Sequence, residues 1–372
     1  MLTGSRPRLP AFALLVGSVL VACGTPTFVV VAGDGGSPEG GPRDGSLDVS
    51  GMSDAPPLDD GARDAPSRYS APTTLVSGEM QPKGITVDPD RLFWVEAATG
   101  DVRTFDKLTS AVTSIAKSQP QPLDIAVDST TLYWSVATAT PTKTSQCMAM
   151  KMLKTSGAPS CLTSAALMTG RLALSGGNVF LSGESSGDLT FVGFAATTSA
   201  NATLPETLTP ATQAVAGDGS DVFVGDGPHV DTFSITVAGT GLQGEPALCN
   251  NNAICGGTGT TVDIVVSAAG AVFWVTSNGQ VMSATPGPNV APTMLGMVPM
   301  GAQRMAVDAS YVYVTSSSGT TTGGAITAVP VAPGATRTLA SGEDSPFGIT
   351  VDVNNVYWTC GNGTIRAVGV PL

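Results

Sequence analysis

The apolar positions of this chain follow a repeating pattern. A short run rich in β-branched residues recurs seven times, at 84–88, 123–128, 171–175, 214–218, 263–267, 304–308 and 348–352, at intervals of 40 to 49 residues. Each run is followed, after a short turn, by a second apolar run. The runs have the length and residue types of strands, and no apolar stripe of helical period is long enough to compete with them. The pattern therefore predicts an all-β domain.

The second run of each repeat carries an aromatic residue close to its start. These aromatics are Phe93, Tyr133, Phe180, Phe223, Phe273, Tyr313 and Tyr357, and all four tryptophans of the chain, Trp94, Trp134, Trp274 and Trp358, come directly after one of them. Further alternating runs complete each repeat. Four short strands per unit of about 44 residues are typical of a β-propeller, in which we expect these aromatic pairs to pack between blades.

Two stretches at opposite ends of the repeat region are nearly the same. Residues 74–88 and 338–352 are identical at eleven of fifteen positions. The last repeat ends after three strands, while 73–78 (TTLVSG) matches the fourth strand of the sixth repeat, 337–342 (RTLASG). We therefore expect a seven-bladed β-propeller over 71–372, with repeats starting near 82, 122, 169, 212, 261, 302 and 346. The N-terminal strand 73–78 would close the last blade as its outer strand and cover an open sheet edge.

The phrases P-K-G-I-T-V-D and P-F-G-I-T-V-D, with L-Y-W and V-Y-W after them, resemble the YWTD, NHL and TolB-type propeller repeats. The resemblance covers about 290 residues and implies a fold rather than an activity. The chain departs from the YWTD form because Cys360, not Asp, follows Trp358-Thr359. Rings of the YWTD and TolB types usually have six blades, so the number seven rests on the repeats of this chain.

The first 22 residues are typical of an export leader. Arg6 and Arg8 precede an uncharged run, 11–22, which is too short to cross a bilayer as a helix. The run ends in Leu20-Val21-Ala22-Cys23, which resembles the lipobox of bacterial lipoproteins. By that resemblance, Cys23 would carry acyl chains (the palmitate type of modification) and anchor the protein in the cell envelope. Gly24 stands where lipoproteins retained in the inner membrane resemble one another in having Asp, which favours the outer membrane. An ordinary secretory leader is the alternative.

Residues 23–70 form an acidic segment rich in Gly, Pro and Ser. After Cys23 it holds eight acidic residues against three arginines, and it lacks the apolar residues that a core needs, so we expect a disordered tether. Loss of Arg6 and Arg8 takes the net charge from −12 to −14. Such a charge argues against nucleic acid as a partner. We expect a monomer whose partners are the membrane and a protein or glycan of the envelope.

Five cysteines remain after Cys23. Cys147 and Cys161 are close in sequence, as are Cys249 and Cys255, so local disulfides are expected in an exported chain, with Cys360 left over. Sequence spacing does not fix the connectivity.

The charged residues near the start of each first strand are the candidate ligand-binding residues. We expect Lys83, Asp124, Arg171, Asp263 and Arg304 to ring the mouth of the channel, where they would bind a polar ligand or satisfy one another. The recurring aspartates Asp88, Asp128, Asp218, Asp308 and Asp352 indicate Asx turns rather than a metal ring. His229, the only histidine, excludes a two-histidine metal site.

Two functions are compatible with this sequence. The first is a non-catalytic binding or scaffold module, without a cofactor. The alternative is a calcium-dependent lactonase- or lyase-like enzyme acting at the channel mouth, which the resemblance allows because some similar propellers use axial carboxylates and an Asn in that way. No serine-hydrolase, zinc-protease or phosphate-loop motif is present in the sequence.

Overall fold

The computed structural model describes residues 70–136, 147–155, 157–164, 169–183, 189–193, 200–201, 214–227, 229–235, 242–244, 258–286 and 291–371. All of them belong to one compact unit, Arg63–Leu372. The leader, Cys23, the acidic segment, Cys249 and Cys255 lie outside the described residues, so the predictions made for them remain predictions. The described part of the chain has no helix that meets the length and hydropathy of a membrane crossing.

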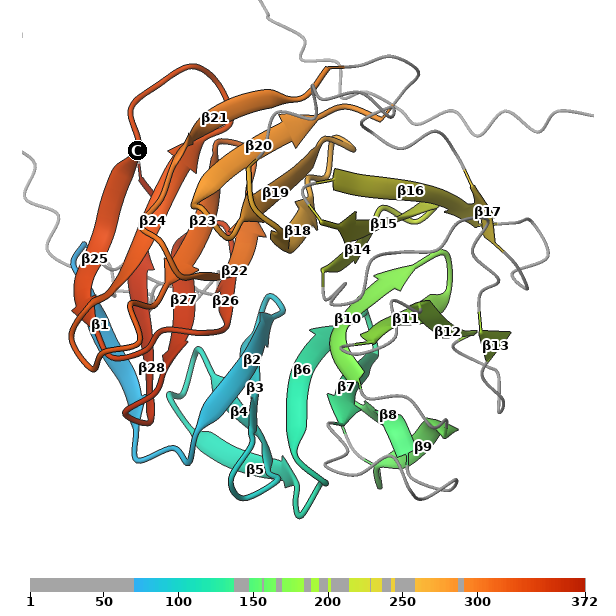
Figure 1. Ribbon diagram of the computed structural model, residues 1–372. Helices are drawn as coiled ribbons and strands as arrows, with labels where there is room; N and C mark the ends of the chain where they lie inside the picture. Colours follow the sequence, from blue (N-terminus) through green and yellow to red (C-terminus); the bar gives the residue numbers. More distant parts are fainter. Residues whose placement is uncertain are drawn as a thin grey trace, which may run out of the picture. The chain divides into compact units, whose positions relative to one another are not determined.

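The described residues form antiparallel strands and no helix, in a β-propeller arrangement (Figure 1). The strands pair into seven four-stranded sheets. The first three sheets contain β2 (Pro82–Val87), β3 (Arg91–Glu96), β4 (Val102–Asp106) and β5 (Val112–Ala116); β6 (Pro122–Val127), β7 (Thr131–Val136), β8 (Cys147–Leu153) and β9 (Ser160–Ser164); and β10 (Thr169–Ser175), β11 (Asn178–Gly183), β12 (Leu189–Gly193) and β13 (Ala200–Asn201).

The next three sheets follow the same order along the chain. They contain β14 (Val215–Gly217), β15 (Asp221–Asp226), β16 (His229–Ile235) and β17 (Leu242–Gly244); β18 (Thr261–Val266), β19 (Val272–Thr276), β20 (Gln280–Ala284) and β21 (Thr293–Met297); and β22 (Ala302–Val307), β23 (Tyr311–Ser316), β24 (Gly324–Pro330) and β25 (Arg337–Glu343).

The last sheet combines the two ends of the repeat region. Its order is β1-β28-β27-β26, with β1 (Thr73–Ser77), β26 (Ile349–Val351), β27 (Asn355–Cys360) and β28 (Thr364–Gly369). β1 pairs antiparallel with β28, and Thr73 lies opposite Ala367. The strand at 73–78, which the near-identity of 74–88 and 338–352 (the duplicated phrase) assigned to the last sheet, thus occupies the outer edge of that sheet. Around the ring each inner strand contacts the inner strand of the next sheet, and β26 contacts β2.

The core consists of apolar clusters between neighbouring sheets. All four tryptophans are fully buried, and the aromatics that precede them are at most 4% exposed. The cluster between the last and first sheets joins Val76 of β1 to Trp94 of β3 and Tyr357 of β27. Large flat side chains fill the wedge between two twisted sheets, so the aromatic pairs have the packing role that their spacing predicts.

The recurring aspartates form the turns between the first two strands. The Oδ1 atom of Asp88 accepts hydrogen bonds from the backbone N–H groups of Asp90 and Arg91, at 2.9 and 2.8 Å. Asp128, Asp218, Asp308 and Asp352 accept the equivalent pairs of bonds. These are the Asx turns that the sequence predicts.

Two lysines join neighbouring sheets at the same end. Lys107 reaches Asp352 at 2.8 Å, and Lys154 reaches Asp88 at 2.9 Å. Burial raises the pKa of Asp352, but the Lys107 ammonium and two backbone N–H groups outweigh it and hold the pKa below its usual value. The ion pair between Lys107 and Asp352 joins the first sheet to the last.

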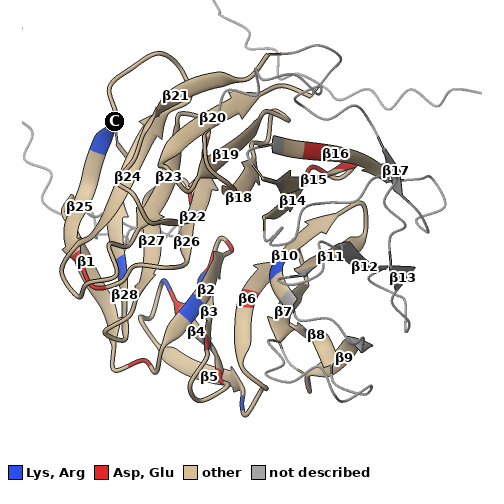
Figure 2. Ribbon diagram, viewed as in Figure 1, with Lys and Arg blue, Asp and Glu red and all other residues tan. Residues whose placement is uncertain are grey.

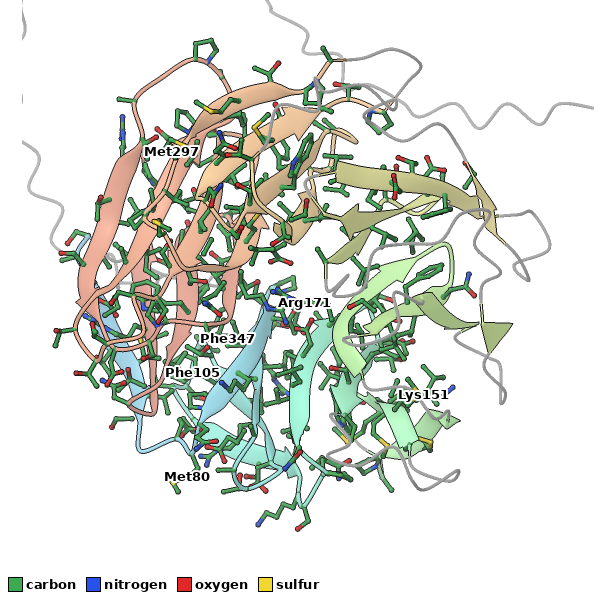
Figure 3. All side chains as sticks on the ribbon, viewed as in Figure 1. Met80, Phe105, Lys151, Arg171, Met297 and Phe347 are labelled. Carbon is green, nitrogen blue, oxygen red and sulfur yellow. A yellow bond between two sulfur atoms is a disulfide. The ribbon has the colours of Figure 1, made fainter. Side chains whose placement is uncertain are left out.

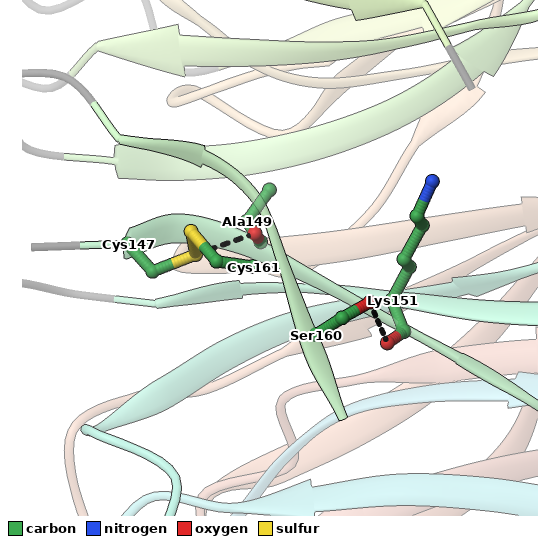
Figure 4. The surroundings of a disulfide bond; sticks show 5 residues. All are labelled: Cys147, Ala149, Lys151, Ser160 and Cys161. Atoms are coloured by element: carbon green, nitrogen blue, oxygen red, sulfur yellow. Dashed lines mark hydrogen bonds between the residues drawn. A yellow bond between two sulfur atoms is a disulfide. The ribbon is translucent and has the colours of Figure 1, made fainter. Parts of the chain in front are cut away.

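A disulfide joins Cys147 of β8 to Cys161 of β9, two adjacent strands of the second sheet (Figure 4). This is one of the two local pairs expected from the sequence. Cys360 is a buried free thiol, and burial followed by the nearby Glu343 carboxylate raises its pKa to about 12.

Candidate functional site

The channel mouth is formed where the inner strands begin. We use "the mouth" for Lys83, Asp124, Arg171, Asp263, Arg304 and Phe347. Figure 2 shows a negative segment on β6 and a positive segment on β10 beside the centre of the ring, and Figure 3 places Arg171 and Phe347 there. A cavity of about 420 Å³ runs along the inner strands and is lined by Asp124, Asp263 and Arg304 among others.

Backbone hydrogen bonds fix the inner strands at the mouth. The N–H groups of Asp124, Arg171, Arg304 and Gly348 each donate to a hydroxyl eleven residues later, on Ser135, Ser182, Thr315 and Thr359. Several of these hydroxyls also donate to the next sheet. Thr359 does so across the seam, to the carbonyl of Lys83 at 2.9 Å. The mouth residues therefore project from a backbone that is held on both sides.

Four of the five predicted residues form one ion-pair network. Arg304 contacts Asp124 at 2.9 Å and Asp263 at 3.9 Å, while Arg171 contacts Asp263 at 3.0 Å. The four residues are at most 9% exposed. Two arginines and two aspartates cancel in charge, so the sequence-based alternative that these residues satisfy one another holds for these four.

The carboxylates also bond the backbone of neighbouring sheets. Asp124 accepts from the N–H of Leu172 at 3.1 Å, and Asp263 accepts from the N–H of Met305 at 2.7 Å. Arg171 donates to the carbonyls of Val262 and Gln303, at 3.1 and 2.9 Å. Charges this buried are tolerated because each has an opposite charge, and Asp124, Asp263 and Arg171 also have hydrogen bonds to backbone groups. The network thus joins sheets across the channel as well as lining it.

Lys83 differs from the other four predicted residues. Gly84, not Lys83, occupies the position equivalent to Asp124, and a Cβ atom at Gly84 would lie 2.8 Å from the Cα of Asp124. Lys83 comes one residue earlier in its repeat than the other four do in theirs, and it takes no part in their ion-pair network. The two strands approach too closely at that point for any side chain.

The Lys83 ammonium lies 4.7 Å from the centre of the Phe347 ring, and the Arg304 guanidinium lies 5.5 Å from the same ring. Lys83 and Phe347 are both partly exposed. Among the described residues no carboxylate lies within ion-pair distance of Lys83, and burial lowers its pKa from the ordinary value of 10.5. Lys83 therefore gives the mouth a net positive charge that no acid of the described chain neutralises.

Phe347 was not singled out in the sequence, although a signal was present. It stands before Gly348 as Lys83 stands before Gly84, in the duplicated phrases PKG and PFG. The two residues are thus equivalent positions of the first and last repeats, and the ring arrangement brings them together. His229 begins β16, and its side chain lies outside the described residues.

The mouth does not offer the donor set of a calcium site. Calcium takes six to eight oxygen ligands, whereas Asp124 and Asp263 already face guanidinium groups and backbone N–H groups. The described residues contain no group of three or more His, Cys, Asp or Glu side chains arranged to hold a metal ion.

A second cavity lies at the opposite end of the channel. It has a volume of about 780 Å³ and is lined by the turns between first and second strands, with Asp128, Asp218 and several glycines, serines and alanines. Asp128 and Asp218 are occupied by their own turns, so this end offers mainly backbone and small side chains.

The sequence matches no family model and no curated protein. Solved structures are similar to it in fold. Virginiamycin B lyase from Staphylococcus aureus superposes with a TM-score of 0.61 at 11% identity, over 81% of this chain and 98% of the lyase. The computationally designed protein Ika8 superposes with a TM-score of 0.58 at 11% identity, over 82% of this chain and all of the designed chain. At this identity the likeness shows the fold alone.

Proposed function

We propose that this chain is a lipid-anchored, non-catalytic binding module of the cell envelope, which takes an acidic group of a protein or glycan partner at the mouth. The observation that carries the proposal is Lys83, a partly buried ammonium held over Phe347 without a carboxylate partner in the described chain. The remaining charges of the mouth cancel. An anion would therefore meet one uncompensated positive charge at the entrance of a cavity.

Physical chemistry supports an anionic ligand here. Burial disfavours the charged form of Lys83, which is why its pKa is lowered. A carboxylate or similar group placed beside the ammonium would stabilise its charged form and so offset the cost of burial. It would also exclude water from the face of the Phe347 ring. Arg304, which also contacts this ring, would add to the attraction without leaving its aspartates.

The lipid anchor and the acidic tether would determine how far from the membrane the mouth binds its partner. Acylation of Cys23, the acidic spacer up to residue 70 and a monomeric ring would place the mouth away from the membrane surface, in our proposal the outer membrane. The partner would then be a protein or glycan with exposed acidic groups in the envelope.

A pull-down from solubilised cell envelope tests this proposal. The full lipidated chain serves as bait, in the wild-type form and as Lys83→Glu. The matched control is Lys117→Glu, which makes the same charge change at an exposed lysine in the loop after β5. We expect the same partner with the wild type and the control, and at least a tenfold loss with Lys83→Glu. Equal recovery with both variants would overturn the mouth as the binding site.

The calcium-dependent lactonase or lyase remains the second candidate, and its support is the fold likeness to a lyase. Hydrolysis or elimination on a panel of lactones, dependent on Ca²⁺ and lost in Asp124→Asn or Asp263→Asn variants that still fold, would replace the binding module by an enzyme. We expect no calcium-dependent turnover, because the arginines already neutralise both carboxylates.

A further inference from the structure

Three exposed methionines lie on β21, the outer strand of the fifth sheet, and in the turn that follows it. The sequence MLGMVPM places Met294, Met297 and Met300 three residues apart, and their exposed fractions are 51%, 50% and 72%. Methionine is usually found in protein interiors, where its flexible side chain fills gaps. Figure 3 shows Met297 beside β21, away from the mouth. Core packing therefore does not explain why three exposed thioethers occur in one short segment.

A β-bulge places two of these methionines on the same face of the sheet. Residues three apart on a regular strand point to opposite faces. On β21, however, Met297 lies opposite Gln280 and Met294 lies opposite Met282, with a register shift between them. Gln280 and Met282 are two apart on β20 and share a face, so Met294 and Met297 share it too. Two Cα atoms on the same face of a strand lie about 7 Å apart, a distance that two long flexible side chains can span.

Gln280 orients one of the sulfur atoms. Its Oε1 accepts hydrogen bonds from the backbone N–H of Thr258 at 2.6 Å and from the Thr258 hydroxyl at 3.3 Å. The amide is thereby fixed, and its Nε2 donates to the Met294 sulfur at 3.9 Å. A thioether sulfur has two lone pairs, so this weak bond positions the sulfur and leaves the second pair free for a ligand.

Met300 follows in the turn before β22. The backbone N–H of Val298 donates to the carbonyl of Gly279 at 2.8 Å, which keeps the chain beside the end of β20 just before this turn. Met300 stands two residues beyond this contact and is the next exposed methionine of the chain after Met297.

We propose that Met294 and Met297, with Met300 as a third donor, bind a soft monovalent cation, Cu(I) or Ag(I). Thioethers favour Cu(I) over hard cations such as Mg²⁺ and Ca²⁺, and they carry no proton that must leave. The net charge of −12 favours approach of a cation. An apolar protein partner fits this edge less well, because Gln280 bonds the Met294 sulfur and is itself bonded to Thr258. The polar Thr293 is also exposed on the same strand.

Titration of the full chain with Ag(I), a redox-inert probe, tests the proposal by calorimetry in chloride-free buffer. We expect one site in the wild type and at least a tenfold weaker one in Met294→Leu/Met297→Leu. Leucine keeps the volume, so the fold should persist. The matched control is Met80→Leu, which removes a single methionine of similar exposure, 55%, from a loop before the first sheet and should change nothing.

Two further measurements separate thioethers from thiols. Binding should survive Cys360→Ala and treatment with N-ethylmaleimide, and it should not change between about pH 6 and 8, because thioethers do not titrate. The methyl signals of Met294 and Met297 should shift in an NMR spectrum on addition of Ag(I). No binding, binding lost with the thiols, or equal binding in the double variant would overturn the site. A protein captured through these methionines without any metal binding would replace the metal site by a docking surface.

Discussion

Glu343 accepts a hydrogen bond from the indole nitrogen of Trp358 at 3.0 Å, and Glu79 accepts the same bond from Trp94 at 2.8 Å. Both glutamates end the phrase that the chain repeats, T-L-x-S-G-E, and each precedes its tryptophan by fifteen residues. Arg366 pairs with Glu343, and Arg103 lies 3.4 Å from Glu79. The duplicated phrase therefore specifies a buried polar cluster as well as a strand.

Replacement of Glu343 by leucine should strongly destabilise the fold. It would leave the Trp358 N–H and the Arg366 guanidinium without their buried acceptor, and removing one partner of a buried ion pair costs about 3–5 kcal/mol. Glu343→Gln keeps an acceptor oxygen and should cost less. Denaturant unfolding measures both variants. A free energy of unfolding for Glu343→Leu within about 1 kcal/mol of the wild type would show that the cluster contributes little.

Glu79 should make stability fall as the pH rises towards neutrality. Burial, followed by a hydrogen bond with Glu96, raises its pKa from 4.5 to about 7, despite Trp94 and Arg103, which lower it. The folded state therefore binds a proton that the unfolded state releases between these values. That contribution is complete below pH 4.5 and is lost as the pH passes through about 7.

Unfolding free energies across this pH range, for the wild type and Glu79→Gln, measure the effect. The glutamine stays neutral at every pH, so its curve should lack the decline that the wild type shows between about pH 5 and 8. Parallel curves for the two proteins would contradict the assignment of the decline to Glu79.

The Cys360 thiol should be inert in the folded protein. It is 1% exposed and its pKa is raised to about 12, so almost no thiolate exists at pH 8. Incubation with iodoacetamide, followed by peptide mass spectrometry, should show Cys360 unmodified in the native protein and modified in denaturant. Rapid native labelling of Cys360 would mean that the last sheet opens locally.

The architecture could be predicted from the sequence because it repeats. The spacing of Phe93-Trp94, Tyr133-Trp134 and Tyr357-Trp358 indicates equivalent strands, and the duplicated phrase indicates where β1 pairs. The turn role of Asp88 and its equivalents followed from local turn chemistry alone. Each of these features depends on residues that are near one another in sequence or stand at the same place in each repeat.

The mouth was predicted less well because it depends on distances across the channel. Nothing in the sequence shows that the strands of Gly84 and Asp124 come too close for a side chain. Nor does it show that Arg304 reaches Asp124 while Lys83 lies over Phe347. The bulge that brings Met294 and Met297 to one face is likewise a property of the pairing register.

The central claim is that the ring is fastened by its own N-terminal strand, and a cross-link tests it most directly. Thr73 and Ala367 are cross-strand partners of β1 and β28, at a spacing that a disulfide can bridge. Under mild oxidation, Thr73→Cys/Ala367→Cys should give one intramolecular link by non-reducing peptide mass spectrometry. A control pair, Thr73→Cys/Thr113→Cys, uses the outer strand of the first sheet and should give none. Failure of the first pair to link, or equal linking of both, would contradict the account.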